Sequence, residues 1–146
     1  DNTELMSLFG FADVKDGVHE FSSGLVYASG SATVEAYNSA TVEASGSATV
    51  TASGSATVEA WESATVTAFD SAIVTACNSA IVTAFDSAIV TACNSATVTA
   101  YGSATVKAYD SVAVLVRSGD PQITLNDKSA MVDYRGGNPV MGTASI

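Results

Sequence analysis

The sequence predicts an all-β fold, a two-walled parallel β-solenoid (β-helix) capped at both ends. Three observations support this prediction. The ten letters FDSAIVTACN occur at residues 69–78 and return at 85–94. Eight-residue units follow one another from residue 23 to residue 118, and apolar and polar residues alternate strictly inside each unit. Such alternation is typical of strands with one buried face, and a fixed repeat period is typical of solenoids.

Each eight-residue unit is expected to form one strand and one corner. Its second, fourth and sixth positions are Ala, Val and Ala, whereas the third and fifth are mainly Thr, Ile, Glu or Lys. The eighth position is Asn, Gly, Asp or Glu and is followed by Ser. Both classes of residue favour turns, because they tolerate left-handed backbone or bond to it. A helix is disfavoured, since it would scatter the valines around its axis.

Two units are expected to close one coil of about 16 residues, because the ten-letter identity recurs at that offset. Ala, Val and Ala fill a narrow gap between two sheets but would leave voids inside a three-sided prism. Successive units then alternate between a first wall and a second wall, and residues sixteen apart become vertical neighbours. About six coils are expected over 23–118, with a length of about 29 Å at ~4.8 Å per coil.

The chain divides into three segments: an N-terminal cap at 1–22, the octapeptide-repeat solenoid at 23–118 and a C-terminal cap at 119–146. Caps are expected because open solenoid ends offer unpaired strand edges. The first segment suits a short helix or loop that plugs the first coil with large apolar residues, namely Leu5, Met6, Leu8, Phe9 and Phe11. In the last segment SGDP predicts a turn and QITL a strand, and SAMVDY repeats the unit pattern out of register.

Composition limits the function classes. Fifteen acidic and five basic residues give a net charge of −10, which repels nucleic-acid phosphates and anionic lipids. No apolar run approaches the ~20 residues that span a bilayer. We therefore expect a soluble protein that binds no nucleic acid and inserts into no membrane, with extracellular and virion-associated locations open. No phosphate loop, nucleophile elbow or zinc-ligand spacing occurs. Enzymatic activity, cofactors and a metal site are not expected.

The tandem SATVxAYD and SATVxAYG units at 31–110 resemble the octapeptide-repeat β-solenoid proteins of bacteria and phages, which are mostly of unassigned function. More distantly, AYGSATVKAYDS is similar to the 16-residue repeats of bacterial ice nucleation proteins, which pair a Tyr-Gly-Ser corner with a Thr-x-Thr strand. The present repeats depart from that pattern by Ile at residues 73, 81 and 89 and by Glu at residues 35, 43 and 59. The resemblance implies a β-solenoid of bacterial or phage origin.

The outward positions of the first wall form a candidate binding surface. Its members are threonines at the third and fifth unit positions: Thr49, Thr51, Thr65, Thr67, Thr83, Thr97 and Thr99. Regular methyl and hydroxyl groups on a flat, rigid face would order water into an ice-like lattice. The simpler interpretation is that Thr is a good exposed strand residue. The second wall is a poorer candidate, because Glu43, Glu59 and Lys107 interrupt it.

The seventh unit position provides a candidate aromatic ladder. Its members are Tyr37, Phe69, Phe85 and Tyr101 on the first wall, with Trp61 on the opposite wall. A contiguous exposed ladder would offer a stacking platform for sugars or a patch for a protein partner. The simpler interpretation is packing, in which each ring covers its neighbours and shields the corner.

Several polar residues at the corners have a structural interpretation. Cys77 and Cys93 are expected as free thiols, because in-register stacking sets Cβ atoms ~4.8 Å apart and a disulfide prefers ~3.8 Å. Asn78 and Asn94 are expected to form an amide ladder. Corner aspartates one coil apart, Asp70 and Asp86, are expected to cap backbone amides, with a bound cation such as calcium as the alternative. The single histidine, His19, is expected in a solvated segment.

The sequence therefore predicts a non-enzymatic structural or binding module that presents a rigid repetitive surface to a protein or glycan partner. Solenoids usually work through extended surfaces. One alternative is an ice-binding protein that uses the threonine columns of the first wall. A second alternative is an acidic DNA-mimic inhibitor. Assembly into a homo-oligomer is left open.

Overall fold

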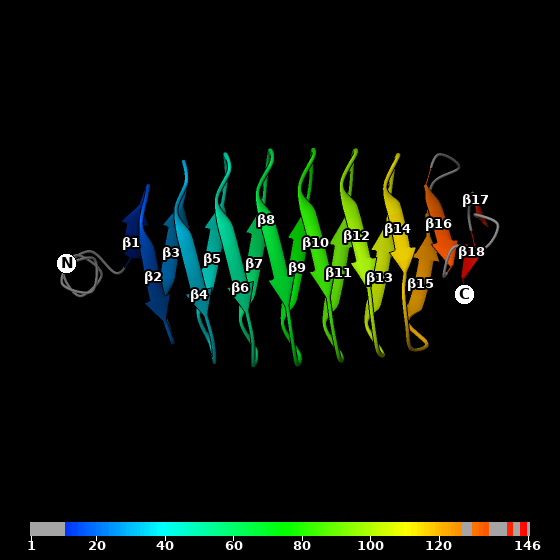
Figure 1. The fold of residues 1–146 in the computed structure, drawn as a ribbon, viewed down its shortest axis with the longest axis horizontal. Helices are drawn as coiled ribbons and strands as arrows, with labels where there is room; N and C mark the ends of the chain where they lie inside the picture. Colours follow the sequence, from blue (N-terminus) through cyan, green and yellow to red (C-terminus); the bar gives the residue numbers. More distant parts are fainter. Residues whose placement is uncertain (1–10, 127–129, 135–139, 142–143, 146) are drawn as a thin grey trace.

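The computed structural model describes residues 11–126, 130–134, 140–141 and 144–145. The regular elements in this part of the chain are all strands, stacked into a two-walled β-solenoid of about seven turns (Figure 1). The strands are β1 (Phe11–Val14), β2 (Val18–Phe21), β3 (Leu25–Ala28), β4 (Thr33–Ala36), β5 (Thr41–Ala44), β6 (Thr49–Ala52), β7 (Thr57–Ala60), β8 (Thr65–Ala68), β9 (Ile73–Ala76), β10 (Ile81–Ala84), β11 (Ile89–Ala92), β12 (Thr97–Ala100), β13 (Thr105–Ala108), β14 (Ala113–Val116), β15 (Gln122–Leu125), β16 (Met131–Tyr134), β17 (Val140–Met141) and β18 (Ala144–Ser145). No helix of the described residues is long and apolar enough to cross a membrane.

The strands form two nine-stranded sheets. The first wall has the order β17-β16-β14-β12-β10-β8-β6-β4-β2, and the second wall has the order β1-β3-β5-β7-β9-β11-β13-β15-β18. Pairing from β1 to β16 is parallel, and through the repeats each residue pairs with the residue sixteen positions away, as Val82 does with Val66 and Val98. The two-walled architecture and the 16-residue coil predicted from the sequence are confirmed.

The core is a thin layer of small side chains between the two walls. Alanine and valine at the second, fourth and sixth unit positions are 0–1% exposed from Ala32 to Ala108. Short side chains of this kind fill a narrow gap between two sheets. Larger buried side chains lie at the two ends of the repeats, Phe21 in β2 and Ile123 and Leu125 in β15.

The corners depend on the eighth unit position, where the backbone is left-handed. The non-glycine residues at this position have φ between 55° and 62°: Asn38, Glu62, Asp70, Asn78, Asp86, Asn94 and Asp110. Asn, Asp and Gly tolerate this conformation better than other residues. The expected turn at each unit boundary is therefore present, and its residue types have a conformational reason.

The N-terminal segment differs from the expected cap. Where a helix or loop was expected, the described part of residues 1–22 forms β1 and β2, which pair in parallel with β3 and β4. Ala12 and Val14 point into the core as the repeat residues do. Phe11, expected to plug the first coil, is 39% exposed and its ring contacts the edge of Tyr27 at 5.4 Å. Leu5, Met6, Leu8 and Phe9 lie outside the described residues.

The C-terminal segment also continues the stack. Gln122 pairs with Thr105 and Met131 pairs with Ala113, at offsets of 17 and 18 residues, so longer corners absorb the shift in sequence register. The strand expected at QITL is confirmed, and SAMVDY, out of register in sequence, pairs in register in space. β17 and β18 then pair antiparallel with β16 and β15 at this end of the walls (Figure 1). These additional strands make the stack longer than the six coils expected for 23–118.

Candidate functional site

The outward side chains of β6, β8, β10 and β12 form one continuous surface on the first wall. Two in-register columns make it up, which together we call the threonine face: Thr49, Thr65, Ile81 and Thr97 in one column, and Thr51, Thr67, Thr83 and Thr99 in the other. All the predicted first-wall threonines therefore lie together. Neighbours are about 4.8 Å apart along the stack and about 6.6 Å apart along a strand.

The threonine face is uncharged and bounded at both ends. The column of four threonines begins after Glu35, which pairs with Thr51, and ends before Leu115, which pairs with Thr99. Fully buried valines lie beneath it, including Val66 and Val82. Since the valine and alanine layer fixes the backbone, the spacing of the hydroxyl and methyl groups is set by the strand ladder.

The second wall carries a different pattern. Glu43 and Glu59 pair in register on β5 and β7, and Lys107 projects from β13. Between them, Ile73 and Ile89 pair in register and are 45% and 42% exposed. The charges expected to interrupt this wall are therefore at its surface, on either side of an apolar centre.

The predicted aromatic ladder divides into parts. Phe69, Phe85 and Tyr101 stack with centroid distances of 4.9 and 4.7 Å and interplanar angles of 8° and 11°. Tyr37 is separated from them by Ser53, and its hydroxyl donates to Oε2 of Glu20 at 3.4 Å. Both faces of Phe85 are covered by its neighbours. The stack presents ring edges to solvent, which suits packing at the corner better than stacking of sugars on ring faces.

Trp61 lies at the other corner of the coil, the one that follows the second-wall strands. It is 41% exposed, and Tyr109 in the same column is 40% exposed. Two coils, with Cys77 and Cys93 at the same position, separate the two rings. Trp61 and the first-wall rings therefore do not form one surface.

Carboxylates at the eighth unit position cap the preceding coil. At four corners a carboxylate oxygen accepts from the backbone N–H sixteen residues earlier: Glu62 from Gly46 at 2.6 Å, Asp70 from Gly54 at 3.0 Å, Asp86 from Asp70 at 3.5 Å, and Asp110 from Asn94 at 3.0 Å. Asp70 and Asp86 therefore act as the expected amide caps. No cluster of three or more metal-ligating side chains occurs in the described part of the chain.

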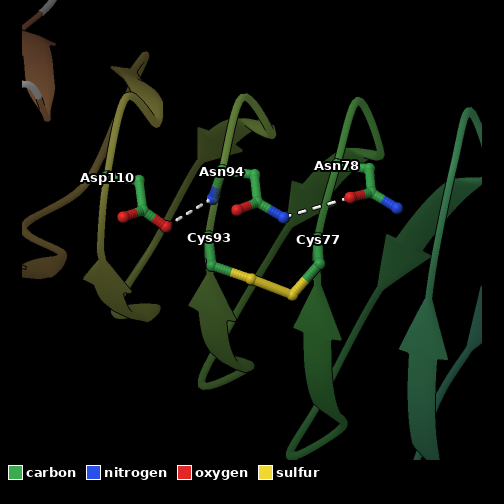
Figure 2. Close-up of a disulfide and its surroundings, with 5 residues drawn as sticks. All are labelled: Cys77, Asn78, Cys93, Asn94 and Asp110. Atoms are coloured by element: carbon green, nitrogen blue, oxygen red, sulfur yellow. Dashed lines mark hydrogen bonds between the residues drawn. A yellow bond between two sulfur atoms is a disulfide. The ribbon is translucent and has the colours of Figure 1, made fainter.

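The expectation of free thiols is wrong, because Cys77 and Cys93 form a disulfide (Figure 2). Their Cα atoms are 4.7 Å apart, within the range that a disulfide spans. The ladder spacing of ~4.8 Å holds for Cβ atoms within paired strands, but Cys77 and Cys93 follow the strands, where their side chains lean toward each other. Cys77 is buried at 6% exposure.

The amide ladder next to the disulfide is as expected. Nδ2 of Asn94 donates to Oδ1 of Asn78 at 3.0 Å, and Asp110 continues the column by accepting from the Asn94 backbone N–H (Figure 2).

The single histidine lies near the N-terminal end of the described residues. Nε2 of His19 lies 2.7 Å from the carbonyl oxygen of Asp16, and the His19 ring stacks on that of Phe21 with the ring centroids 6.5 Å apart. His19 is therefore half-buried in β2 instead of lying in an open segment.

The apolar centre of the second wall, Ile73 and Ile89, is a surface that was not predicted from the sequence. The sequence does contain the signal for this surface, because Ile73 and Ile89 are sixteen residues apart and therefore stack.

Comparison with known proteins gives no match: no family model, no curated protein and no solved structure matches this chain.

Proposed function

We propose that this chain is a non-enzymatic structural or binding module that presents its threonine face to a protein or glycan partner. The main support is the contrast between that face and the rest of the molecule. The chain carries a net charge of −10, yet eight adjacent outward positions on four strands hold seven threonines and one isoleucine. A regular, uncharged face with hydroxyl groups suits contact with a partner whose own groups repeat.

The scaffold supports this role because it is rigid where the face lies. β6, β8, β10 and β12 pair in register over all four residues, and their inward side chains are 0% exposed. A preorganised surface loses little conformational entropy on binding. The serines that begin each unit recur at corner after corner, as Ser71 and Ser87 do, which supports a structural role for them over a catalytic one.

The disulfide supports a location outside the reducing cytosol. Cross-links such as Cys77–Cys93 form and persist in oxidising environments. We therefore propose an extracellular or virion-associated module of bacterial or phage origin; the origin rests on the resemblance of the SATVxAYD and SATVxAYG units.

Ice is the second candidate ligand for the same face. The observation that favours it is the uninterrupted column Thr51, Thr67, Thr83 and Thr99, with a second column beside it. Methyl and hydroxyl groups then repeat in two directions on a flat surface. A DNA mimic has less support, since the carboxylates of Glu62, Asp70, Asp86 and Asp110 are turned to backbone N–H groups.

The threonine face is tested by placing charges on it. Thr67 and Thr83 are in-register neighbours, so Thr67→Lys with Thr83→Lys disrupts the centre of one column. Ser71→Lys with Ser87→Lys adds the same charges at exposed corner positions and serves as the matched control. We expect the first pair, and not the control, to abolish retention on a panel of immobilised polysaccharides.

A nanolitre osmometer separates ice from the other ligands. Faceted crystals and thermal hysteresis that disappear in the Thr67→Lys, Thr83→Lys protein support ice binding. Their absence at millimolar protein removes ice as a ligand. Binding that both lysine pairs weaken equally would contradict the assignment of the face, whichever ligand is retained.

A further inference from the structure

The second wall has a surface whose charges have no ion-pair partner among the residues that the structure describes. We call the following residues the second-wall patch: Glu59, Ile73, Thr75, Ile89, Thr91 and Lys107. Glu59 on β7 has Glu43 and Thr75 as its cross-strand neighbours, and like charges placed side by side are destabilising. Lys107 on β13 lies between Thr91 and Thr124. Neither charge forms an ion pair with the residues that the structure describes.

The two charges are too far apart to pair with each other. β7 and β13 are separated by β9 and β11, so Glu59 and Lys107 lie about three strand spacings, or ~14 Å, apart. Both occupy the same position along their strands. On the two strands between them, Thr75 and Thr91 continue the same column. In the neighbouring outward column of these strands, the exposed Ile73 and Ile89 form an apolar centre. A neutral centre thus has opposite charges on its two sides.

This arrangement is complementary to itself. A two-fold axis parallel to the strands, placed between β9 and β11, reverses the order of the strands and keeps each position along them. It sets β7 opposite the partner's β13, so Glu59 faces the partner's Lys107 and Lys107 faces the partner's Glu59. Ile73 faces the partner's Ile89. We propose that two copies of this chain dock through their second walls in this way, as an isologous dimer.

The aromatic residues of the second corner fit the same rotation. Trp61 follows β7 and Tyr109 follows β13, and both are about two-fifths exposed. The axis that pairs Glu59 with the partner's Lys107 also sets Trp61 opposite the partner's Tyr109. Trp and Tyr are enriched in the energetically dominant parts of interfaces. Burial of these rings at both ends of the patch adds to the burial of the isoleucines.

The axis lies near the middle of the wall, so most of the wall takes part. From β3 to β18, eight of the nine strands have a counterpart. Seven strands of four residues and the two-residue β18, at ~4.8 Å per strand and ~3.3 Å per residue, cover roughly 500 Å² on each copy. The total of roughly 1,000 Å² is at the low end for specific interfaces, so a reversible dimer with a dissociation constant in the micromolar range is expected.

The first wall does not offer this complementarity. The equivalent axis between β8 and β10 would set Glu20 opposite the partner's Asp133, and Asp133 already lies 3.6 Å from Arg117. It would also set Glu35 opposite the partner's Leu115. Self-docking of the first wall would therefore place the like charges of Glu20 and Asp133 opposite each other, which is costly. Docking of the second walls leaves both threonine faces exposed, on opposite sides of the dimer.

Charge-swap variants test the pairing. In Glu59→Lys a lysine faces the partner's Lys107, and in Lys107→Glu a glutamate faces the partner's Glu59. Each variant should weaken dimerisation by about tenfold or more in sedimentation equilibrium, because the repulsion occurs twice. The double variant restores opposite charges and should restore the dimer. A mixture of the two single variants should form heterodimers, since both pairs are then attractive.

Arginine substitutions provide the matched control. Ile73 and Ile81 lie on opposite walls and have similar exposure, 45% and 47%. Ile73→Arg should abolish the dimer and Ile81→Arg should leave it intact, with circular dichroism confirming the solenoid in both. A wild-type protein that stays monomeric at millimolar concentration overturns the proposal. The proposal is also overturned if a mixture of Glu59→Lys and Lys107→Glu forms no heterodimer, or if Ile81→Arg abolishes the dimer. The monomeric Ile73→Arg protein keeps the threonine face, so retention on the polysaccharide panel tests the proposed function separately.

Discussion

Where the eighth residue of a unit is acidic, it has two tasks. It adopts left-handed backbone, and its side chain caps the N–H of the equivalent residue one coil earlier, as Asp110 does for Asn94. Glu62, Asp70, Asp86 and Asp110 meet both requirements, whereas Gly meets only the first. At the corner after β12 the acceptor is a backbone atom, since the Gly102 N–H donates to the carbonyl oxygen of Ser118. The variation among Asn, Asp and Gly therefore follows from one backbone requirement with an optional cap.

Substitution of Asp110 separates the two tasks. Asp110→Gly removes only the cap of the Asn94 N–H and should cost about 0.5–1.5 kcal/mol of unfolding free energy. Asp110→Ala also places a Cβ atom in left-handed backbone, which adds about 1–2 kcal/mol. Asp110→Asn retains an acceptor oxygen and should cost the least. Urea unfolding of dilute protein should show that the loss of unfolding free energy increases from Asp110→Asn to Asp110→Gly to Asp110→Ala. If Asp110→Gly and Asp110→Ala lost the same unfolding free energy, the claim that left-handed backbone at this residue disfavours a Cβ atom would be contradicted.

At the scale of one strand and one corner, much could be predicted from the sequence. The alternation of Ala, Val and Ala with outward Thr fixed which side of each strand is buried, and the offset of sixteen fixed which residues stack. Both follow from periodicity alone. The threonine face could be predicted for this reason, because its residues all lie within strands.

The features that could not be predicted lie where strict periodicity ends. The disulfide depends on how side chains lean at a corner, which the ladder spacing does not specify. β1 and β2 retain inward Ala12, Val14 and Phe21 but lack the SATV letters. β15 and β16 continue the walls at offsets of 17 and 18, because the corners before them are longer. The break in the letters marks a change of corner length and composition, and the stacking of strands continues past it.

The disulfide joins two adjacent coils near the middle of the stack. Its effect can be measured with Cys77→Ser and Cys93→Ser, because Ser45 occupies the same column and shows that serine fits there. A cross-link that closes a loop of this size contributes about 3 kcal/mol, chiefly by restricting the unfolded chain. We expect the serine variants to unfold at lower urea concentration than the wild type. Wild type treated with dithiothreitol should match them, and an unchanged midpoint would contradict a formed disulfide.

At the scale of the whole molecule, one property governs the rest. The slab is thin because its interior is alanine and valine, so two sheets suffice and each coil needs only sixteen residues. This geometry assigns the threonine face to one wall and the second-wall patch to the other. In the proposed dimer the second-wall patches of the two copies contact each other, and the two threonine faces point outward on opposite sides.

The assignment of residues to walls can be measured directly by thiol cross-linking in the Cys77→Ser, Cys93→Ser background. Three double variants each contain Thr67→Cys and a second cysteine. The second substitution is Thr83→Cys, sixteen residues away, Thr75→Cys, eight residues away, or Thr91→Cys, twenty-four residues away. A short bifunctional thiol reagent should bridge only the first pair within one chain, because Thr67 and Thr83 are in-register neighbours on the first wall. Thr75 and Thr91 lie on the second wall and face away. Cross-linking at an offset of eight or twenty-four would contradict the two-walled, sixteen-residue coil.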